Sequence, residues 1–282
     1  MKNIVVATDF SNDAYAALFY VTKLLSEQTC TIYILNVFDE HTPLKGKISK
    51  ALLGKKGLEG IATESKEKLA STLHKIVLDL DKPAHHFQIL SKEGELVEVI
   101  KEVIAEHKID LLVMGSKGET GAKEIFLGSN TINVAKAINK CPILAVPKQA
   151  DYKAIKEIAF VTDFKKGCTK EIIAPLLFVA SLSGAAVRIM HIVEEKSLSA
   201  EQRSHKKLLE LCLKNIDHSY HWTTDFPYKA QVIDTFLQNL DIDMFAMVHH
   251  RRSFLGRLAR QPVIKELNMR VDTPFLILPD ND

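Results

Sequence analysis

The chain has 282 residues and carries the same series of motifs twice. The motif IVVATDFS begins at Ile4 and returns as IAFVTDFK at Ile158, and ILNVFDE at Ile34 returns as IMHIVEE at Ile189. Two later motifs, DLLVMG and CPILAVP, return in the same order as DMFAMV and TPFLILP. This repeat constrains the fold most, because it requires one folding unit that can be built twice from different sequences.

Within each copy, short apolar runs alternate with segments of helical periodicity. In the first copy, helices are predicted to begin at the capping residues Ser11 to Asp13, before Leu69, at Glu95 and after Gly128. Strands that alternate with helices pair in parallel, and the helices then cover both faces of the sheet. The predicted strands are residues 4–6, 31–37, 86–90, 110–114 and 143–146.

We therefore predict an α/β fold made of two tandem, doubly wound, Rossmann-like domains. Each domain has a mostly parallel five-stranded sheet with helices on both faces. The predicted domains are residues 1–148 and residues 153–282. The second copy is shorter, and the additional residues of the first gather between Pro43 and Gly60 in a stretch rich in lysine and glycine. We expect a mobile surface loop there, with a lid or a partner-docking segment as the alternative.

Composition indicates a globular protein, which we expect to work in the cytoplasm. There are 37 basic and 35 acidic residues, a net charge of +2, so no global field favours nucleic acid or a membrane surface. No apolar run approaches the roughly 18 residues of a membrane span, and the N-terminus lacks a signal-peptide pattern. The four cysteines form no C-x-x-C pair and no zinc-type spacing, so no metal site is predicted, and Cys141 is expected to be buried.

The glycine-rich stretch MGSKGETGAKEIFLGS, from Met114 to Ser129, follows an apolar strand and precedes a helix. Ligands of open parallel sheets bind beyond the carboxyl ends of the strands, and Asp9, Val37 and Gly115 lie at or just past such ends. Glycines let the backbone approach a ligand closely. A helix N-terminus offers N–H groups and a positive dipole end, which suit phosphate. The stretch is therefore a candidate phosphate site.

Two familiar phosphate motifs are excluded. The first strand is followed by ATDFSND, which lacks the glycines of a dinucleotide fingerprint, and Ala122 separates Gly121 from Lys123, which breaks a P-loop. What the stretch does match is G-x2-G-x9-G-S. Together with ATD after the first strand and the terminal PILAVP, this pattern resembles the nucleotide-binding branch of the universal stress protein family. The resemblance covers both copies, so the whole chain resembles a tandem member of that family.

The resemblance implies an adenine nucleotide alpha hydrolase-like fold that binds ATP, or ADP or AMP, with Mg²⁺ held mainly through the phosphates. The family's usual glycine–proline turn reads Glu93-Gly94-Glu95 here, and because the proline is absent we leave this turn out of the site. Helix capping is an alternative role for Asp9, Ser129 and Thr131. The implied ligand residues are Ala7, Thr8 and Asp9 on the adenine and ribose side, Val37 at adenine, Met114, Gly115, Ser116 and Gly118 beneath the ribose and phosphates, and Gly128, Ser129, Asn130 and Thr131 around the phosphates.

The second copy has VHHRRSFLGRLARQP in place of the glycine stretch. Val248, Arg251 and Arg260 take the places of the three motif glycines, and each adds a side chain where phosphate and backbone would meet. We therefore predict that only the first domain binds a nucleotide, and that the three glycines serve the phosphates rather than the fold. For the basic run from His249 to Arg260 we expect a solvated face or a subunit contact, with an anion pocket as the alternative.

No nucleophile–base pair or carboxylate dyad stands out, so no catalytic residue is predicted. The leading hypothesis is a stress-response regulatory protein in which ATP occupancy alters contacts with an unidentified protein partner. The alternatives are a slow ATPase or self-phosphorylating enzyme, and a structural interaction module that keeps the fold without the ligand. The resemblance also implies that residues 143–146 and 275–278 pair to make an internal pseudo-dimer. Two chains are expected to form a homodimer.

Overall fold

The computed structural model describes most of both copies. The described residues are 2–40, 42, 54–80, 84–116, 127–150, 152–165, 168–193, 197–224, 236, 239–248 and 273–279. The elements in chain order are β1 (Lys2–Ala7), α1 (Asn12–Leu24), β2 (Cys30–Phe38), α2 (Gly54–Asp79), β3 (His86–Glu93), α3 (Leu96–His107), β4 (Leu111–Gly115), α4 (Ser129–Ala137), β5 (Ile143–Val146), β6 (Glu157–Val161), α5 (Lys170–Ser183), β7 (Ala186–Val193), α6 (Ala200–Leu213), β8 (His218–Thr224), β9 (Met244–Val248) and β10 (Phe275–Leu278).

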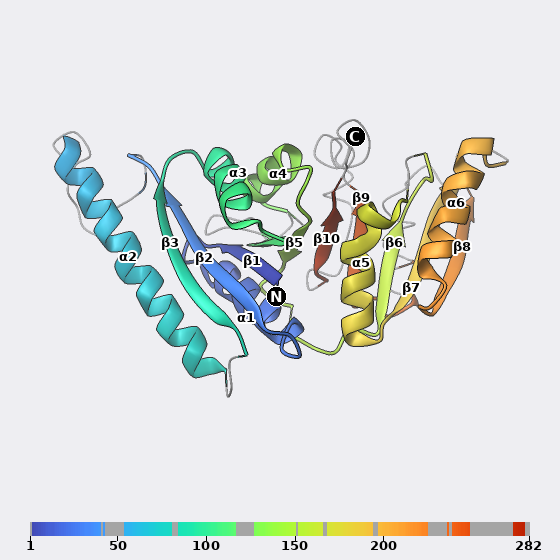
Figure 1. Cartoon of the computed structure of the whole chain (residues 1–282), viewed down its shortest axis with the longest axis horizontal. Coiled ribbons are helices and arrows are strands. Elements are labelled where there is room, and N and C mark those ends of the chain that lie inside the picture. The colour runs from blue at the N-terminus through green and yellow to red at the C-terminus, as the bar shows by residue number, and fades with distance from the viewer. Residues whose placement is uncertain are drawn as a thin grey trace.

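The described strands form one ten-stranded sheet in the order β3-β2-β1-β4-β5-β10-β9-β6-β7-β8. Within each half the pairings are parallel. β5 and β10 meet antiparallel, with Leu144 opposite Leu276. Figure 1 shows this joint in the middle of the molecule, and β3 and β8 are the two edge strands of the sheet. The predicted α/β fold, the five parallel strands of each half and the pairing of the last strands are confirmed.

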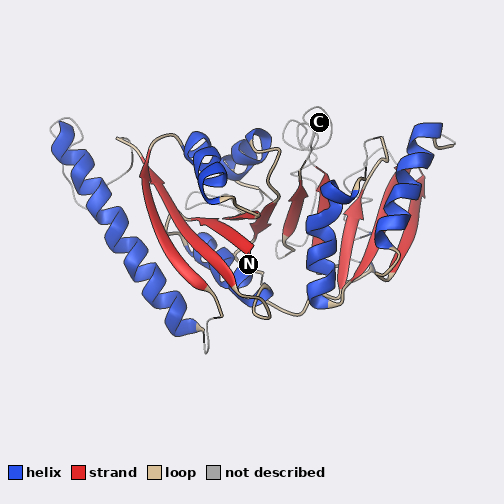
Figure 2. Cartoon of the chain, in the orientation of Figure 1, coloured by secondary structure: helices blue, strands red, loops and turns tan. Residues whose placement is uncertain are grey.

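Helices lie on both faces of the sheet, as Figure 2 shows. α1, α2, α5 and α6 pack on one face, where one core cluster includes Leu69 from the first half and Leu209 from the second. α3 and α4 pack on the other face through residues such as Ile100 and Val134. Both clusters contain side chains of β5 and of β10, so the two halves share their cores across the joint.

An aspartate at the amino end of the sheet has the same role in both halves. Asp110, just before β4, accepts a hydrogen bond of 2.9 Å from the amide of Asn3 on β1. Asp243, just before β9, accepts bonds of 2.8 and 3.1 Å from the amides of Lys156 and Glu157 at the start of β6. Each carboxylate ties the starts of two neighbouring parallel strands through charge-assisted bonds. The recurrence of aspartate in DLLVMG and DMFAMV is therefore explained by the fold.

The prediction of a loop from Pro43 to Gly60 is wrong for its last part, because α2 already begins at Gly54. Gly57 is buried and Ile61 is 7% exposed, so the first turns of this helix pack against the protein. Each glycine costs a helix about 1 kcal/mol relative to alanine, and tertiary packing outweighs that cost here. Residues 43–53 of this stretch lie outside the described residues.

All four cysteines are free thiols, and Cys141 is buried as predicted. Desolvation by burial raises the pKa of the Cys141 thiol to about 12, which keeps it protonated at neutral pH. Of the helices in the described part of the chain, none has both the length and the apolar character that crossing a membrane requires.

Candidate functional site

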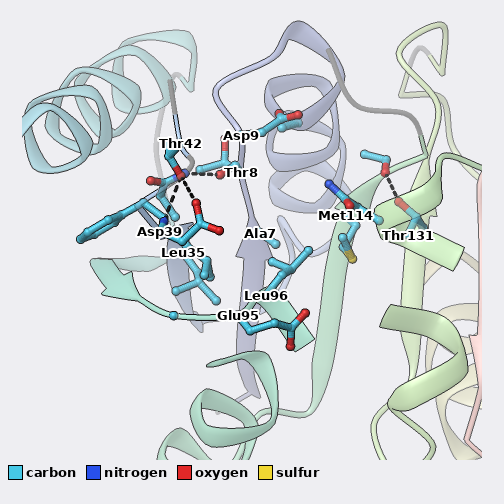
Figure 3. A pocket seen from close by; sticks show the side chains of 17 residues that line it. Ala7, Thr8, Asp9, Leu35, Asp39, Thr42, Glu95, Leu96, Met114 and Thr131 are labelled. Atoms are coloured by element: carbon cyan, nitrogen blue, oxygen red, sulfur yellow. Dashed lines mark hydrogen bonds between the residues drawn. The ribbon is translucent and has the colours of Figure 1, made fainter. Parts of the chain in front are cut away.

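A pocket of about 320 Å³ opens at the carboxyl end of the sheet in the first half. It lies around β1 and its neighbours β2 and β4, where the order of the strands reverses. Open parallel sheets bind their ligands at such a reversal. Ala7, Leu35, Leu96 and Met114 give the pocket an apolar floor (Figure 3). A flat apolar part of a small ligand can pack on this floor.

The structure brings most of the predicted ligand residues together at this pocket. Ser116, Gly128 and Ser129 lie just beside the lining, at the end of β4 and the start of α4. Gly118 lies outside the described residues. The predicted residues that line the pocket are Ala7, Thr8, Asp9, Val37, Met114, Gly115, Asn130 and Thr131.

Two hydrogen bonds hold the start of α4 against the end of β4. The amide of Gly128 donates to the carbonyl of Ser116 at 2.6 Å, and the Thr131 hydroxyl donates to the carbonyl of Gly115 at 2.9 Å. The Thr131 hydroxyl, predicted to grip phosphate, is thus a donor within the protein. This hydrogen bond is buried and links the first turn of α4 to the last residue of β4, so it helps to fix the orientation of the helix.

The first turn of α4 faces the pocket through Asn130 and Thr131. Its N-cap is Gly128, which supplies no side-chain hydrogen bond to the helix. By contrast, the Ser11 side chain caps α1 by accepting from the amide of Ala14. The first N–H groups of a helix have no partner within it and carry partial positive charge. This end of the pocket therefore suits an anionic group.

The Thr8-Asp9-Phe10 turn after β1 has a role in the fold. The Phe10 amide donates to Thr8 Oγ1 at 3.0 Å, and the Ser11 amide donates to Asp9 Oδ1 at 3.0 Å. Phe10 has a φ of 64°, a left-handed conformation that costs about 1–3 kcal/mol in a residue other than glycine. The two side-chain bonds offset part of this strain.

The second half builds the same turn. The Phe164 amide donates to Thr162 Oγ1 at 3.1 Å, the Lys165 amide donates to Asp163 Oδ1 at 2.9 Å, and Phe164 has a φ of 55°. The motif TDF therefore recurs in both halves because the chain needs it to leave the strand. Asp9 lines the pocket, but its presence alone does not mark a ligand site.

Gly115 has a structural role that sequence reasoning denied it. A Cβ atom at this position would lie 3.0 Å from the carbonyl carbon of Asp13 and 3.1 Å from the nitrogen of Ala14. Both are backbone atoms of the first turn of α1, which cannot rotate away as a side chain would. The prediction that the motif glycines do not serve the fold is wrong for Gly115, because any side chain there would require the first turn of α1 to shift away from β4.

The second half has a valine at the corresponding position. In register, Val248 of β9 takes the place of Gly115, since each follows a methionine that pairs with the last residue of the first strand in its half. The turn from strand to helix spans residues 8–11 in the first half and 162–169 in the second. Val248 is buried, with 7% of its surface exposed. Arg251 and Arg260, with the rest of the basic run, lie outside the described residues.

Aromatic and histidine side chains gather at the carboxyl ends of the strands in the second half. Phe164 stacks on His191 with ring centroids 4.8 Å apart, and His191 meets the Trp222 ring edge-on at 5.1 Å. In register, His191 and Trp222 take the places of Asn36 and Ser91. The polar positions of the first half are thus occupied by rings in the second.

Two further segments of the pocket were missed by sequence reasoning. Asp39 and Thr42 lie just after β2. Gly94, Glu95 and the first residue of α3, Leu96, follow β3 at the turn that the missing proline led us to leave out. Gly94 has a φ of 143°, and a Cβ there would come within 2.9 Å of the Val99 side chain, so the turn requires glycine. The sequence signal that could have identified this turn as part of the pocket was the position of Gly94 directly after a predicted strand.

The described lining is rich in carboxylates. Asp9, Asp39 and Glu95 belong to it, at three different strand ends. Glu95 is also the N-cap of α3, where its side chain accepts from the amide of Glu98 at 3.1 Å. Within the described residues, no group of three or more histidine, cysteine, aspartate or glutamate side chains converges on a possible metal site. Asp9 and Glu95 each accept a hydrogen bond from a backbone amide two or three residues further along the chain.

The fold and the pocket define the class: a doubly wound α/β protein with a pocket at the carboxyl end of its strands, bordered by a helix N-terminus. The model of the universal stress protein family matches residues 1–147. The chain is 33% identical over 156 residues to universal stress protein MJ0577 of Methanocaldococcus jannaschii, which covers 52% of this chain and 96% of that one. The chain belongs to the universal stress protein family.

Two comparisons cover both halves. Universal stress protein Slr1230 of Synechocystis is 29% identical over 295 residues, which cover 98% of this chain and 99% of that one. A solved universal stress protein from Archaeoglobus fulgidus has a TM-score of 0.69 over 99% of this chain and 97% of that chain, at 18% identity. The second similarity concerns the fold alone.

Proposed function

We propose that residues 1–148 form a domain that binds ATP, with Mg²⁺ held through the phosphates, and that residues 153–282 form a domain without this site. The observation that carries the proposal is the combination in one pocket of an apolar floor and the open N-terminus of α4. The floor suits a purine ring, and the helix end suits phosphate. The motif G-x2-G-x9-G-S, through Gly115, Gly118, Gly128 and Ser129, supports the same assignment.

The spacing of the strands sets the direction of the ligand. β4 and β2 are separated by β1, and neighbouring strands lie about 4.8 Å apart, so their ends are about 10 Å apart. A nucleotide whose phosphates meet α4 must therefore extend its base across β1 toward the end of β2. That end carries Leu35 and Val37 and faces Leu96.

The backbone of Val37 supports adenine at that end. The carbonyl of Leu35 accepts from Thr8 on the β1 side, while the carbonyl of Phe38 accepts from Gly94 on the β3 side. Since successive residues of a parallel strand point their backbone groups to alternate sides, Val37 points its N–H and carbonyl toward the β1 side, beyond the last pair of that ladder at Ala7 and Leu35. A donor next to an acceptor matches the ring nitrogen and amino group of adenine.

The proposed role is regulatory: ATP occupancy of the first half alters contacts with a protein partner under stress. The described pocket offers groups that position a ligand, and the Thr131 hydroxyl is engaged within the protein. We further propose that the chain works in the cytoplasm and forms a homodimer, in line with the expectations from its sequence.

The test is a charge change at the open helix end. Asn130→Asp is nearly isosteric and places a negative charge in the first turn of α4, where it stabilises the helix by about 0.3–1 kcal/mol but repels phosphate. We expect wild-type protein to bind one Mg–ATP per chain by calorimetry, and Asn130→Asp to bind at least about tenfold more weakly with undiminished thermal stability. Asn215→Asp, at an exposed position in the second half, is the matched control and should bind as wild type.

Two results would refute the proposal. Wild-type protein that takes up no nucleotide has no such site, and two nucleotides per chain would mean that the second half binds one as well. A thermal shift on adding Mg–ATP gives an independent readout, because a ligand that binds only the folded state raises the melting temperature.

A further inference from the structure

A series of hydrogen bonds links α2 to the turn after β1. Asn36, near the end of β2, is 7% exposed, and its Nδ2 donates to the carbonyl of Thr8 at 2.7 Å. Its Oδ1 accepts from the hydroxyl of Ser65 at 2.8 Å, and Ser65, on α2, is 4% exposed. Because the Ser65 hydroxyl has one proton and gives it to Asn36, Ser91 on β3 is the donor in the 2.8 Å bond between the two serines. The series therefore runs in one direction, from Ser91 through Ser65 and Asn36 to Thr8.

The bond to the Thr8 carbonyl fixes the direction of the next peptide N–H. The Thr8 amide donates to the carbonyl of Leu35 at 2.8 Å, so both backbone groups of Thr8 point toward β2. In a trans peptide the N–H lies opposite the carbonyl of the preceding residue. The Asp9 N–H therefore points away from β2, to the side on which β4 lies.

On that side, the Asp9 N–H lies past the end of the ladder between β1 and β4. The last pair of this ladder is Ala7 and Met114. A longer ladder would offer the N–H the carbonyl of Gly115, but this carbonyl accepts from the Thr131 hydroxyl. Within the described residues, no backbone carbonyl accepts from the Asp9 N–H. Both Asp9 and Gly115 line the pocket, so this N–H is a donor at the point where the order of the strands reverses.

The proposed direction of the nucleotide decides which part of it meets this donor. The base extends toward the end of β2 and the phosphates meet α4, so the end of β1 lies between them, at the sugar and the first phosphate. Both of these groups present oxygen acceptors. On the basis of the proposed nucleotide site, we infer that Asn36, held by Ser65, is a positioning residue for the ligand. It holds the peptide between Thr8 and Asp9 so that the Asp9 N–H donates to an oxygen of the sugar or the first phosphate.

The second half forms the corresponding bond with a different side chain. His191 takes the place of Asn36, and its Nδ1 donates to the carbonyl of Thr162 at 2.9 Å. The bond to this carbonyl therefore also serves the turn itself. A role of Asn36 in the fold alone would predict a loss of stability without a loss of nucleotide affinity, and this difference is what the experiment has to measure.

The test compares variants of Asn36 and Ser65 by calorimetry on the folded protein. Asn36→Leu keeps nearly the same shape and removes the bond to Thr8. We expect its affinities for ATP, ADP and AMP to fall by the same factor of about ten, because all three contain the sugar and the first phosphate. Asn36→His, which copies the second half, should restore most of the affinity.

Two variants on α2 form a matched pair. Ser65→Ala leaves the Asn36 amide in place but frees it to turn, so we expect a smaller loss of affinity than for Asn36→Leu. Thr72→Val also removes a hydroxyl from α2, one that donates to the carbonyl of Lys68 within the helix and lies outside the pocket lining. This variant should bind the three nucleotides as the wild type does.

Hydrogen exchange at the Asp9 amide gives a readout that a change of stability alone would not move. The amide of Phe10, which donates to Thr8 Oγ1, serves as the internal reference. At saturating ATP, exchange of the Asp9 amide relative to this reference should slow strongly in the wild type and little in Asn36→Leu. Equal slowing in the two proteins would overturn the inference.

Failure of the inference is distinct from failure of the proposed site. If Asn36→Leu binds as tightly as the wild type, Asn36 serves the fold alone and the site stands. Ser65→Ala decides the same question if the leucine variant does not fold. A loss that grows with the number of phosphates, or an Asn36→His variant that binds no better than Asn36→Leu, would also overturn the inference. If the wild-type protein binds no nucleotide, the site itself is wrong.

Discussion

Gly115→Ala tests whether the first glycine of the motif serves the fold. The added Cβ would lie 3.0 Å from the carbonyl carbon of Asp13 and 3.1 Å from both the Asp13 oxygen and the Ala14 nitrogen. Ordinary carbon contacts begin near 3.5 Å, so α1 has to retreat by a few tenths of an ångström. All three contacted atoms are backbone, and α1 is held in place by Leu18 and Val21 in the core.

The expected cost follows from two opposing effects. Overpacking a tight site costs about 1–3 kcal/mol, while alanine in place of glycine restricts the unfolded chain and returns about 0.4–1 kcal/mol where the backbone conformation is compatible. We expect Gly115→Ala to lose about 1 kcal/mol of the free energy of unfolding, and Gly115→Val, which copies the second half, to lose about 2–3 kcal/mol.

The assay is urea unfolding of nucleotide-free protein, followed by circular dichroism, with the midpoint and slope fitted together. Nucleotide-free protein is essential, because bound ligand would add its own stabilisation. If Gly115→Ala is as stable as the wild type and only its nucleotide affinity falls, the structural account is refuted and the glycine serves the ligand alone. If stability falls as expected, any loss of affinity has to be corrected for the shift of α1.

The other predictions concern the helix clasp, the strand ties and the joint. Thr131→Val leaves the buried carbonyl of Gly115 without its donor and should cost about 1–3 kcal/mol in urea unfolding. Burial raises the pKa of Asp243, but hydrogen bonds from Lys153 and from the amides at the start of β6 outweigh it, so the pKa is lowered overall. The contribution of the Asp243 carboxylate to the free energy of unfolding should therefore be complete above its unfolded pKa, which is near 4. This contribution should be lost as the pH falls through the lower folded pKa. The free energies of unfolding of the wild type and Asp243→Asn should differ by about 1.5–3 kcal/mol at pH 7, and this difference should disappear in acid. Ile277→Asp places a charge at a residue of β10 that is 1% exposed and lies opposite Ile143 of β5. The substitution should lower the free energy of unfolding by several kcal/mol and make the joint between β5 and β10 susceptible to limited proteolysis. An unchanged digestion pattern would contradict the shared core.

The elements were predictable from the sequence because their signals are local. The apolar run of β5 was predicted at its observed bounds, Ile143–Val146, and Ser11 marks the start of α1 by its capping bond. The pocket was located because strand ends converge at one edge of a parallel sheet. By contrast, the bonds between Asp39 and Thr42 depend on the path of a turn, which no periodicity reveals.

The close approach at Gly115 could not be read from the sequence either, because it joins segments about a hundred residues apart that meet only in the fold. The first turns of α2, Gly54 to Gly60, were missed for a related reason. Its glycines predict a loop, but burial of this part of the helix, as at Gly57 and Ile61, outweighs their low helix propensity. Where local preference and tertiary packing disagree, packing decides.

The internal repeat separates residues that serve the fold from residues that serve a ligand. The TDF turn and the aspartates at the strand starts recur with the same hydrogen bonds in both halves, so they need no ligand to explain them. Gly115 differs between the halves, and it differs together with the length of the turn that precedes the helix. The short turn brings the start of α1 beside the end of β4, and Ala14 of that helix lines the pocket. Gly115 therefore serves the fold and the candidate site at once, because a side chain there would displace the start of α1, which carries Ala14, from the end of β4.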